Sequence, residues 1–435
     1  MRIAIKTLGC KVNQYDSAVI QNRLEADWHS FVPFEERADF YIINACTVTD
    51  RADWEARQLV RRAKRLNPEA RVLVTGCYAQ VSPQDVARVP GVDFVLGLNR
   101  LDDLIQFVRN SERPAKTKIS VGNPRDERGV RVLGASHLPG HTRAFLKIEE
   151  GCNYSCTYCI IPIARGLSRS VPLDEVLKQV RSLAREGIKE LVLTGIHLGG
   201  YGHDLRPRTD LVALLESIVG SGLLPRIRLS SLDPREVTDR LLRLMCDSDV
   251  LCPHLHVCLQ AGDDGVLKRM RRNYSTAFYR DLMMQAREML PDAALGTDII
   301  AGFPGETDED FERSIEFLNS LPMTYFHVFP YSIRRGTVAA ALPDQLSLEV
   351  KRIRAKRVRE LGAKKKKAFY QQFVGLQVSV LVEQSVDGAN GLYRGYSRNY
   401  VQVRFPAEPG QINHEVRVTL EGLEGGCLRG TILED

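Results

Sequence analysis

Short apolar runs of strand length alternate with segments of helical periodicity through the first third of the chain. The apolar runs are residues 3–7, 40–44 and 72–75, and the helical segments are residues 17–26 and 52–66. In the second helical segment, apolar positions recur every three or four residues until an Asn-Pro pair ends the pattern. Strands that alternate with helices form parallel sheets that the helices cover. The pattern predicts a doubly wound α/β domain.

The same rhythm repeats six times in the middle of the chain. The candidate strands are residues 145–149, 191–194, 227–231, 254–260, 297–301 and 326–331. Helical segments such as residues 173–186 and 309–318 separate them. Six consecutive strand–helix units predict a partial (β/α)6 barrel rather than the complete eight-unit form. Before this region, residues 111–139 are rich in Arg, Lys, Pro, Gly and Asp, which predicts a linker.

The last quarter of the chain has a third pattern. A basic helical segment, residues 346–372, precedes short strands at residues 377–383, 392–396, 401–405, 415–420 and 430–433. Five short strands in about 60 residues predict a small antiparallel β-barrel. Together the three patterns predict an α/β protein with domains at residues 1–125, 140–370 and 373–435.

Composition narrows the setting in which the protein works. Apolar residues make up 44% and charged residues 26% of the chain, as in soluble globular proteins. No stretch approaches the roughly 18 apolar residues of a membrane span, and the N-terminus lacks the apolar core of a signal peptide. We therefore expect a cytoplasmic protein without a membrane partner. In that reducing compartment, clustered cysteines bind metals or catalyse more often than they form disulfides. The net charge of +6 permits a nucleic-acid partner without requiring one.

Three cysteines lie close together directly after the first predicted barrel strand. Cys152, Cys156 and Cys159 form a C-x3-C-x2-C run, and loops at the carboxyl ends of barrel strands build active sites. Three thiolates can hold three irons of a four-iron cluster, and no fourth cysteine nearby completes the set. One iron would then stay open, as catalytic metal sites require. The cysteine spacing alone leaves a structural zinc loop as an alternative.

A second set of cysteines is dispersed in the sequence. Cys10, Cys46 and Cys77 each follow the carboxyl end of a predicted strand in the first region. In an open α/β sheet these ends form the ligand-binding edge, so we expect the three thiols to converge on a second cluster with one open iron. The alternative is that they pack as small apolar residues, which is less favoured for three equivalent positions.

The cysteine loop at residues 152–159 resembles the signature of the radical S-adenosylmethionine (radical-SAM) superfamily. The resemblance implies that the open iron binds S-adenosylmethionine and that the cluster releases a 5′-deoxyadenosyl radical from it, with Tyr158 near the adenine. Four later motifs close predicted strands and would gather at one mouth of the barrel, where glycine lets backbone approach the cofactor. Their candidate cofactor contacts are Gly195, Ser230, Gln260, Asp298 and Gly302. Each could instead be a turn residue at a strand end.

Over its whole length the chain resembles the methylthiotransferase family. That family joins an α/β domain with a second cluster, a radical-SAM partial barrel and a C-terminal TRAM domain. The resemblance implies two 4Fe-4S clusters, with S-adenosylmethionine serving both as methyl donor and as radical source. It also implies that a methylthio group replaces the hydrogen of an inert C–H bond.

The residues around Cys10 carry information on the substrate. Residues 9–16 resemble the branch of the family that acts on N6-threonylcarbamoyladenosine next to the tRNA anticodon. Two departures from the usual residues are Ile163 and Ala261, and the second removes a hydroxyl group and any contact that it would make. Isopentenyladenosine in tRNA, a ribosomal-protein aspartate and a non-catalytic, metal-stabilised RNA-binding protein stay open as alternatives.

The tail of the chain combines basic and aromatic residues. Ten Lys or Arg and one acid lie between residues 351 and 367, which alone favours a solvated helix face. Small β-barrels, however, commonly bind nucleic acid, and alternating aromatic and basic side chains can stack bases and contact phosphates. We expect the anticodon loop of tRNA to contact Tyr393, Arg394, Tyr396, Arg398 and Tyr400. An electron donor such as a flavodoxin or ferredoxin is expected as a further partner.

The two cysteine sets make a quantitative prediction for anaerobically purified, reconstituted protein. We expect about eight irons per chain in the wild type and about four after Cys152, Cys156 and Cys159 are all replaced by Ala, because each set of three thiolates holds one cubane. The measurement is the iron and sulfide content per chain. Zinc in place of iron, or no metal, would favour the non-catalytic alternative.

Overall fold

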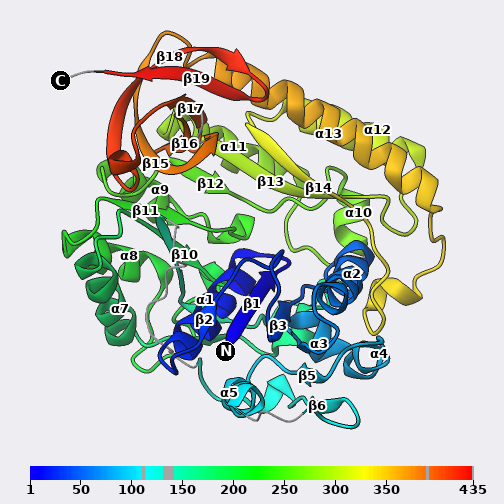
Figure 1. Cartoon of the computed structure of the whole chain (residues 1–435). Coiled ribbons are helices and arrows are strands. Elements are labelled where there is room, and N and C mark those ends of the chain that lie inside the picture. The colour runs from blue at the N-terminus through cyan, green and yellow to red at the C-terminus, as the bar shows by residue number, and fades with distance from the viewer. Residues whose placement is uncertain (110–112, 131–141, 388–390, 434–435) are drawn as a thin grey trace. The chain divides into compact units, whose positions relative to one another are not determined.

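The computed structural model describes residues 1–109, 113–130, 142–387 and 391–433 (Figure 1). The chain divides into two compact units. The first comprises Met1–Ser136, Lys147–Val171 and Ser332–Ala341, and the second comprises His137–Leu146, Pro172–Tyr331 and Leu342–Asp435. The N-terminal sheet and the cysteine loop thus belong to one unit, and the two barrels belong to the other. The three-domain boundaries at residues 1–125, 140–370 and 373–435 stay a prediction.

Six parallel strands form the sheet of the first unit, in the order β2-β1-β3-β4-β5-β6. Their bounds are Arg2–Thr7 (β1), Ser30–Phe31 (β2), Phe40–Asn44 (β3), Arg71–Thr75 (β4), Phe94–Leu96 (β5) and Lys118–Ser120 (β6). The connecting helices are α1 (Lys11–Glu25), α2 (Asp50–Leu66), α3 (Cys77–Val81), α4 (Pro83–Ala87) and α5 (Leu101–Arg109). This topology confirms the predicted doubly wound α/β architecture.

Both faces of this sheet are apolar. Successive residues of a strand point to opposite sides of the sheet, and consecutive residues of these strands are apolar. On one face, Tyr41 and Val72 belong to a buried cluster with residues of α2, α3 and α4. On the other face, Phe40 stacks on Phe94 and Phe94 stacks on Phe107 of α5, with ring centroids 6.0 and 4.7 Å apart. Burial on both sides explains why the strands read as continuous apolar runs in the sequence.

Two details of the first unit differ from the sequence-based expectation. Helix α1 begins at Lys11 rather than at residue 17, and Cys10 is its N-cap residue. Its first turns carry buried polar residues such as Asn13, which is 0% exposed. Because these buried positions are polar, the apolar periodicity of a helix does not show in this part of the sequence. The linker prediction is wrong for β6, which pairs in parallel with β5. Residues 131–139 of the predicted linker lie outside the described residues.

The cysteine loop lies between two short strands of the first unit. Strand β8 (Glu149–Glu150) pairs antiparallel with β9 (Arg169–Ser170), and the short helix α6 (Ile161–Arg165) follows Cys159. The backbone N–H of Val171 donates to the carbonyl of Ile148 at 2.9 Å and extends this closure. The loop is therefore held at both ends.

The β/α barrel consists of two three-stranded sheets with the orders β11-β10-β7 and β12-β13-β14. Their strands are Arg143–Lys147 (β7), Glu190–Thr194 (β10), Arg226–Leu229 (β11), His254–His256 (β12), Ala294–Ala301 (β13) and Tyr325–Pro330 (β14). Isolated parallel bridges, Ile227 with Leu251 and Leu232 with Val257, connect the two sheets. The strands therefore follow one another in chain order, as a partial (β/α)6 barrel requires.

Helices cover this barrel between its strands. They are α7 (Leu173–Arg185), α8 (Leu211–Gly220), α9 (Asp239–Asp247), α10 (Asp264–Arg269), α11 (Thr276–Met289) and α12 (Asp308–Ser320). Five of them begin at a side chain that accepts a hydrogen bond from the first turn, namely Asp210, Thr238, Asp263, Ser275 and Thr307. Such caps satisfy backbone donors that the helix itself leaves unpaired. No helix in the described part of the chain is long and apolar enough to cross a membrane.

The long helix α13 (Leu348–Gln371) leads into a closed barrel with the strand order β15-β16-β17-β19-β18. The strands are Gln377–Asp387 (β15), Leu392–Ser397 (β16), Gln402–Pro406 (β17), Glu415–Glu424 (β18) and Cys427–Ile432 (β19). Four neighbouring pairs are antiparallel, whereas β17 and β19 pair in parallel. The predicted small barrel is confirmed, and it closes through one parallel pair.

A buried ion-pair network connects the two barrels of the second unit. Glu190 of β10 accepts hydrogen bonds from Arg228 at 2.7 and 3.1 Å and pairs with Arg226 at 2.8 Å. The same two arginines donate to backbone carbonyls of the small barrel, those of Tyr396 and Arg398, at 3.1 and 2.9 Å. Burial alone would raise the pKa of Glu190, but the guanidinium groups of Arg228 and Arg226 lower it to about 2.

The network predicts how stability depends on pH. The pKa of Glu190 is about 2 in the fold against an ordinary 4.5, so its stabilising effect is complete above pH 4.5 and is lost as the pH falls toward 2. The shift corresponds to about 3 kcal/mol. Replacing Glu190 by Gln leaves two buried guanidinium groups without their carboxylate, and we expect a loss of about 3 to 5 kcal/mol at neutral pH. Urea unfolding at neutral and acidic pH measures both effects.

The matched control for this prediction is Glu216→Gln. Glu216 pairs with Arg240 at 2.6 Å, but the two side chains are 46% and 50% exposed. Such exposed pairs contribute about 1 kcal/mol or less. Equal losses in the two variants, or an unchanged acid limb in the Glu190 variant, would contradict the assignment.

Candidate functional site

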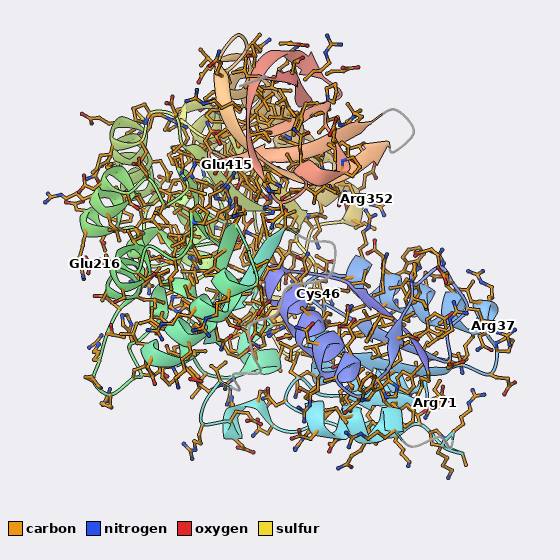
Figure 2. All side chains as sticks on the ribbon, turned by 60° about the vertical axis from the view of Figure 1, so that its left-hand side comes forward. Arg37, Cys46, Arg71, Glu216, Arg352 and Glu415 are labelled. Atoms are coloured by element: carbon orange, nitrogen blue, oxygen red, sulfur yellow. The ribbon has the colours of Figure 1, made fainter. Side chains whose placement is uncertain are left out.

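Cys10, Cys46 and Cys77 lie just beyond the carboxyl ends of β1, β3 and β4, which are neighbours in the sheet. Figure 2 labels Cys46 at this edge of the sheet. The figure also labels Arg37, which precedes β3, and Arg71, which begins β4, and both lie at the opposite edge. The chain order of the strands reverses between β1 and β3, and ligands bind at such switch points. The predicted convergence of the three strand ends is therefore present.

Two glycines allow the turns that carry these thiols to approach one another. Gly9 has a φ of +119°, and a Cβ there would lie 2.6 Å from the Cβ of Cys46. Gly76 has a φ of +90°, and a Cβ there would lie 2.6 Å from the carbonyl oxygen of Ala45. Only glycine combines this conformation with this lack of space. The turns before Cys10 and Cys77 are thus packed directly against the turn that carries Cys46.

The surroundings of two of these thiols, those of Cys46 and Cys77, oppose ionisation unless a cation is present. Burial, and after it the thiol of Cys77, raises the pKa of Cys46 to about 12. Burial also raises the pKa of Cys77, while the nearby guanidinium of Arg165 lowers it. A bound iron cluster would supply the positive charge that holds such thiols as thiolates. The donor set therefore fits a metal cluster.

The loop with Cys152, Cys156 and Cys159 is closed by backbone contacts within the first unit. The N–H of Cys152 donates to the carbonyl of Gly166 at 3.1 Å, and the N–H of Cys159 donates to that of Cys156 at 3.1 Å. Gly151 has a φ of +84°, and a Cβ there would lie 2.0 Å from the carbonyl oxygen of Leu167. All three cysteines are partly exposed. Three thiols on one tight turn, open on one side, fit a four-iron cluster with a free iron.

Four of the predicted cofactor contacts of the second unit follow the ends of strands, whereas Asp298 lies within β13. Gly195 follows β10, Ser230 follows β11, and Gly302 follows β13 with a φ of +78°. Gln260 follows β12 in the left-handed region, with a φ of +74°. The Oγ of Ser230 is buried and has no hydrogen-bond partner among the described residues. Such an unsatisfied polar atom suits a bound ligand. The role of these residues, and of Tyr158 in the first unit, stays a prediction.

Asp298 belongs to a polar network on β12, β13 and β14, in which His256 is buried, Asp298 is partly exposed and His327 is exposed. It pairs with His256 at 3.0 Å and His327 at 3.4 Å, and it accepts a hydrogen bond from the thiol of Cys258 at 3.3 Å. The hydroxyl of Tyr325 lies 3.2 Å from the other ring nitrogen of His256. Burial would raise the pKa of Asp298, but the two histidines lower it well below its usual range. A cofactor contact by Asp298 would therefore add to protein contacts already made.

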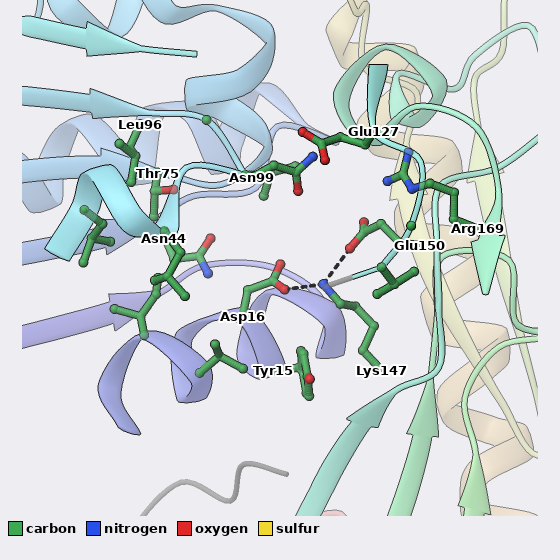
Figure 3. A pocket seen from close by; sticks show the side chains of 18 residues that line it. Tyr15, Asp16, Asn44, Thr75, Leu96, Asn99, Glu127, Lys147, Glu150 and Arg169 are labelled. Atoms are coloured by element: carbon green, nitrogen blue, oxygen red, sulfur yellow. Dashed lines mark hydrogen bonds and ion pairs between the residues drawn. The ribbon is translucent and has the colours of Figure 1, made fainter. Parts of the chain in front are cut away.

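A small pocket lined by both apolar and charged residues lies beside the first-unit cysteines, with a volume of about 60 Å³. Figure 3 shows residues of α1 and of the strand ends around it, with Lys147 between Asp16 and Glu150. The ammonium of Lys147 pairs with these carboxylates at 2.7 and 2.6 Å. Asp16 and Glu150 also pair with Arg165, the residue that donates to Cys77. The pocket wall is therefore continuous with the surroundings of the second cysteine set.

The five residues predicted to bind RNA have several different surroundings. Tyr393 is 5% exposed and belongs to the core of the small barrel. Tyr396 and Tyr400 stack on each other with ring centroids 4.9 Å apart. Arg398 pairs with Glu415 at 3.1 Å. Arg394 lies on β16 and is partly exposed.

Three of these residues dock the small barrel onto the β/α barrel. The guanidinium of Arg228 lies 4.8 Å from the ring centroid of Tyr400, and that of Arg143 lies 5.0 Å from that of Tyr396. Arg398 donates to the carbonyl of Pro225 at 3.1 Å. These contacts do not favour base stacking by Tyr396 and Tyr400, and burial does not favour it for Tyr393. RNA binding by the set stays a prediction without structural support.

Sequence reasoning did not find the charged network beside the cysteines. Arg165, which follows the cysteine loop, is 1% exposed and is paired with Glu150 at 2.6 Å. Asp16, Lys147 and Glu150 complete the network. One signal for this network was present in the sequence. Charged residues of opposite sign lie immediately before and after the cysteine loop, and a solvated surface would not require that arrangement.

Two protein-family profiles match the chain. The Radical SAM superfamily matches residues 146–318, and the Uncharacterized protein family UPF0004 matches residues 2–97. Among curated proteins, threonylcarbamoyladenosine tRNA methylthiotransferase MtaB of Bacillus subtilis is 38% identical over 96% of this chain and 93% of its own. The protein of that name from Aquifex aeolicus is 38% identical over 93% and 96%. The tRNA-2-methylthio-N(6)-dimethylallyladenosine synthase of Moorella thermoacetica is 33% identical over 99% and 98%.

A solved structure has a similar fold. It is the radical S-adenosylmethionine methyltransferase TsrM of Kitasatospora setae, with cobalamin and a [4Fe-4S] cluster bound. The TM-score is 0.54 at 17% sequence identity, and the match covers 78% of this chain and 77% of that chain. At this identity the similarity concerns the fold alone.

The barrel, the cysteine loop after its first strand, the family profile and the curated relatives define a radical-SAM iron–sulfur enzyme. Within that class, the chain belongs to the methylthiotransferase family. It is therefore a transferase rather than a non-catalytic RNA-binding protein. The family implies S-adenosylmethionine and two 4Fe-4S clusters as cofactors, which the two sets of three thiols fit.

The geometry of the cysteine loop generates a prediction for Gly151. In Gly151→Ala the new methyl group would collide with the Leu167 carbonyl, because the Cβ position lies 2.0 Å from that oxygen. We expect the loop to open and the iron content to fall from about eight to about four per chain. Reductive cleavage of S-adenosylmethionine should be lost. Iron analysis and the yield of 5′-deoxyadenosine measure the two effects.

The matched control is Gly187→Ala. Gly187 has a φ of +81°, and nothing lies within 4 Å of a Cβ built there. This variant carries the same backbone strain of about 1 to 2 kcal/mol without the collision, and it should keep both clusters. Full iron loading in the Gly151 variant would refute the proposed closure of the loop.

Proposed function

We propose that the enzyme replaces the C2 hydrogen of N6-threonylcarbamoyladenosine, next to the anticodon of tRNA, with a methylthio group. The observation that carries this proposal is the 38% identity over 96% of the chain to the Bacillus subtilis protein named for that substrate. Two relatives named as dimethylallyladenosine synthases are 33% and 34% identical over 99% of the chain. Methylthiolation of isopentenyladenosine in tRNA is therefore the second candidate.

The proposed chemistry assigns distinct tasks to the two sets of cysteines. When bound, one cluster with S-adenosylmethionine supplies the 5′-deoxyadenosyl radical, and the other carries the sulfur that is methylated and transferred. Cys152, Cys156 and Cys159 would hold the first cluster, and Cys10, Cys46 and Cys77 would hold the second. Each set leaves one iron without a protein thiolate for the exchangeable ligand.

The described residues of the barrel mouth would orient the cofactor. Ser230 offers a buried hydroxyl with no partner among the described residues. Gly195 follows β10 without a side chain that would keep a ligand away from the backbone. At Gly302 the space of a side chain is taken by Lys351, whose Cγ would lie 2.6 Å from a Cβ there. The positive φ of Gln260 turns the chain four residues after the end of β12. These features support the predicted cofactor-binding role of the strand ends.

The basic helix α13 offers a surface for the RNA backbone. Its exposed cations include Arg352, Lys356, Arg359, Lys364 and Lys367, and Figure 2 labels Arg352 on this helix. Cations along a helix attract phosphates and release counterions when RNA binds. We assign phosphate contacts to this helix and to Arg394. A flavodoxin or ferredoxin is the proposed source of electrons.

The substrate assignment is tested with one tRNA prepared in two forms. One form carries N6-threonylcarbamoyladenosine next to the anticodon, and the other carries isopentenyladenosine there. We expect the reconstituted enzyme to methylthiolate the first form at least about tenfold faster, because a site built for the polar threonyl group loses hydrogen bonds with the apolar one. Mass spectrometry of the released nucleosides measures the product.

The variant with Cys152, Cys156 and Cys159 replaced by Ala is the negative control for this assay. Preference for isopentenyladenosine would establish the second candidate. Cleavage of S-adenosylmethionine without methylthiolation of either tRNA would overturn both candidates.

A further inference from the structure

Arg165 links the loop that carries one set of cysteines to the site of the other. It is the last residue of α6, the helix that directly follows Cys159. Its side chain is fully buried. Its Nε donates a hydrogen bond to the Sγ of Cys77 at 3.3 Å. All of these residues belong to the first unit.

The rest of the guanidinium group is fixed by three oxygen acceptors. Its Nη1 donates to Glu150 at 2.6 Å, and its Nη2 donates to Asn13 at 2.7 Å and to Asp16 at 3.1 Å. Asn13 is itself oriented by a hydrogen bond from its amide to the carbonyl of Leu8 at 3.0 Å. A planar guanidinium held on two sides cannot rotate, so its Nε–H stays directed at the sulfur.

The backbone of Arg165 is also held in place. Its carbonyl accepts a hydrogen bond from the side chain of Arg169 at 3.1 Å. The next residue, Gly166, has a φ of +76°, and a Cβ there would lie 2.4 Å from the carbonyl oxygen of Pro124. The position of Arg165 is therefore fixed independently of its contact with Cys77.

The charged groups around Arg165 balance one another without a contribution from Cys77. Arg165 and Lys147 are the cations of the network, and Asp16 and Glu150 are its carboxylates. These four charges already balance. A thiolate at Cys77 is then an additional anion, and the Nε–H of Arg165 is the donor directed at it.

We propose that Arg165 is a positioning residue that acts through Cys77 and raises the reduction potential of the second cluster. The proposal rests on the assignment of Cys10, Cys46 and Cys77 to that cluster, but not on the identity of the tRNA substrate. The reduced cluster carries one more negative charge than the oxidised cluster. A buried cation and a hydrogen bond to a ligand sulfur therefore stabilise the reduced form.

The position of Arg165 links the reduction potential of the second cluster to the loop that holds the first. The residue is six positions after Cys159 in the sequence, and it contacts Cys77 through its side chain. Any displacement of the cysteine loop would move the donor away from the sulfur. The potential of the second cluster is thus coupled to the conformation of the loop that holds the first.

The test measures the midpoint potential of the second cluster in the full-length chain. Cys152, Cys156 and Cys159 are replaced by Ala, so that the reconstituted protein carries the second cluster only. Arg165→Gln, Arg165→Lys and Arg169→Gln are then compared in this background by redox titration followed with electron paramagnetic resonance. No tRNA is present, so a wrong substrate assignment cannot affect the result.

Arg169 is a matched control because it is also a buried arginine near the cysteine loop, 6% exposed. Its guanidinium group donates to the carbonyls of Pro124 and Arg165 rather than to a sulfur. We expect Arg165→Gln to lower the midpoint potential by at least about 59 mV, which is a tenfold change for a one-electron couple. Arg165→Lys keeps the charge and should lower it by less. Arg169→Gln removes a hydrogen bond to the Arg165 carbonyl but no donor to the sulfur, so it should shift the potential by much less than Arg165→Gln.

Iron content is measured alongside the potential, because Arg165→Gln leaves buried carboxylates and could prevent loading of the cluster. If that variant carries no iron, Arg165→Lys decides the question. A potential equal to that of the parent in a loaded Arg165→Gln protein, or in Arg165→Lys when only that variant loads, would overturn the proposal. An equal shift in Arg169→Gln would overturn it as well.

Discussion

The shared direction of β1, β3 and β4 is the constraint on which the second cysteine site depends. Parallel strands end at one edge of a sheet, so residues far apart in sequence meet there without any local motif. Gly9 and Gly76 then bring the three turns into direct contact, with positive φ values of +119° and +90°. The cysteines are thus assembled by topology, and the glycines set the distance between the turns.

Both compact units stabilise buried charged side chains by pairing them in networks. In the first, Lys147 and Arg165 alternate with Asp16 and Glu150 beside Cys77. In the second, Glu190 lies between arginines that also hold the backbone of the small barrel. A buried ion costs free energy unless it is paired and hydrogen-bonded, and each of these groups has several partners. Such networks tolerate little displacement, which suits segments that must hold cofactors.

The sequence was sufficient for features that depend on one segment or on one kind of chemistry. The strand at residues 40–44 coincides with β3 because both faces of that strand are apolar. The convergence of the strand ends that carry Cys10, Cys46 and Cys77 followed from strand order and the known edge of parallel sheets. The order of the six barrel strands followed from their repeated alternation with helices.

Features that depend on partners far away in the sequence could not be predicted from the sequence. The start of α1 was missed because Asn13 and Asp16 face a polar interior, whose existence depends on Arg165 far along the chain. The alternation of Tyr396, Arg398 and Tyr400 looked like an RNA-binding surface, but these side chains contact Arg143, the Pro225 carbonyl and Arg228 and so dock one barrel on the other. A sequence shows that such side chains can stack and pair, but it does not show with what.

The closure of the small barrel has a consequence for how the protein is made. Strand β19 pairs with both β17 and β18, so it is the last strand in the chain that completes the ring. Until it has left the ribosome, both of its neighbours have an unpaired edge, and exposed edges recruit other strands. Loss of β19 through a late stop codon would make that state permanent. Premature termination before Cys427 would therefore yield aggregation-prone protein rather than a slightly shortened enzyme.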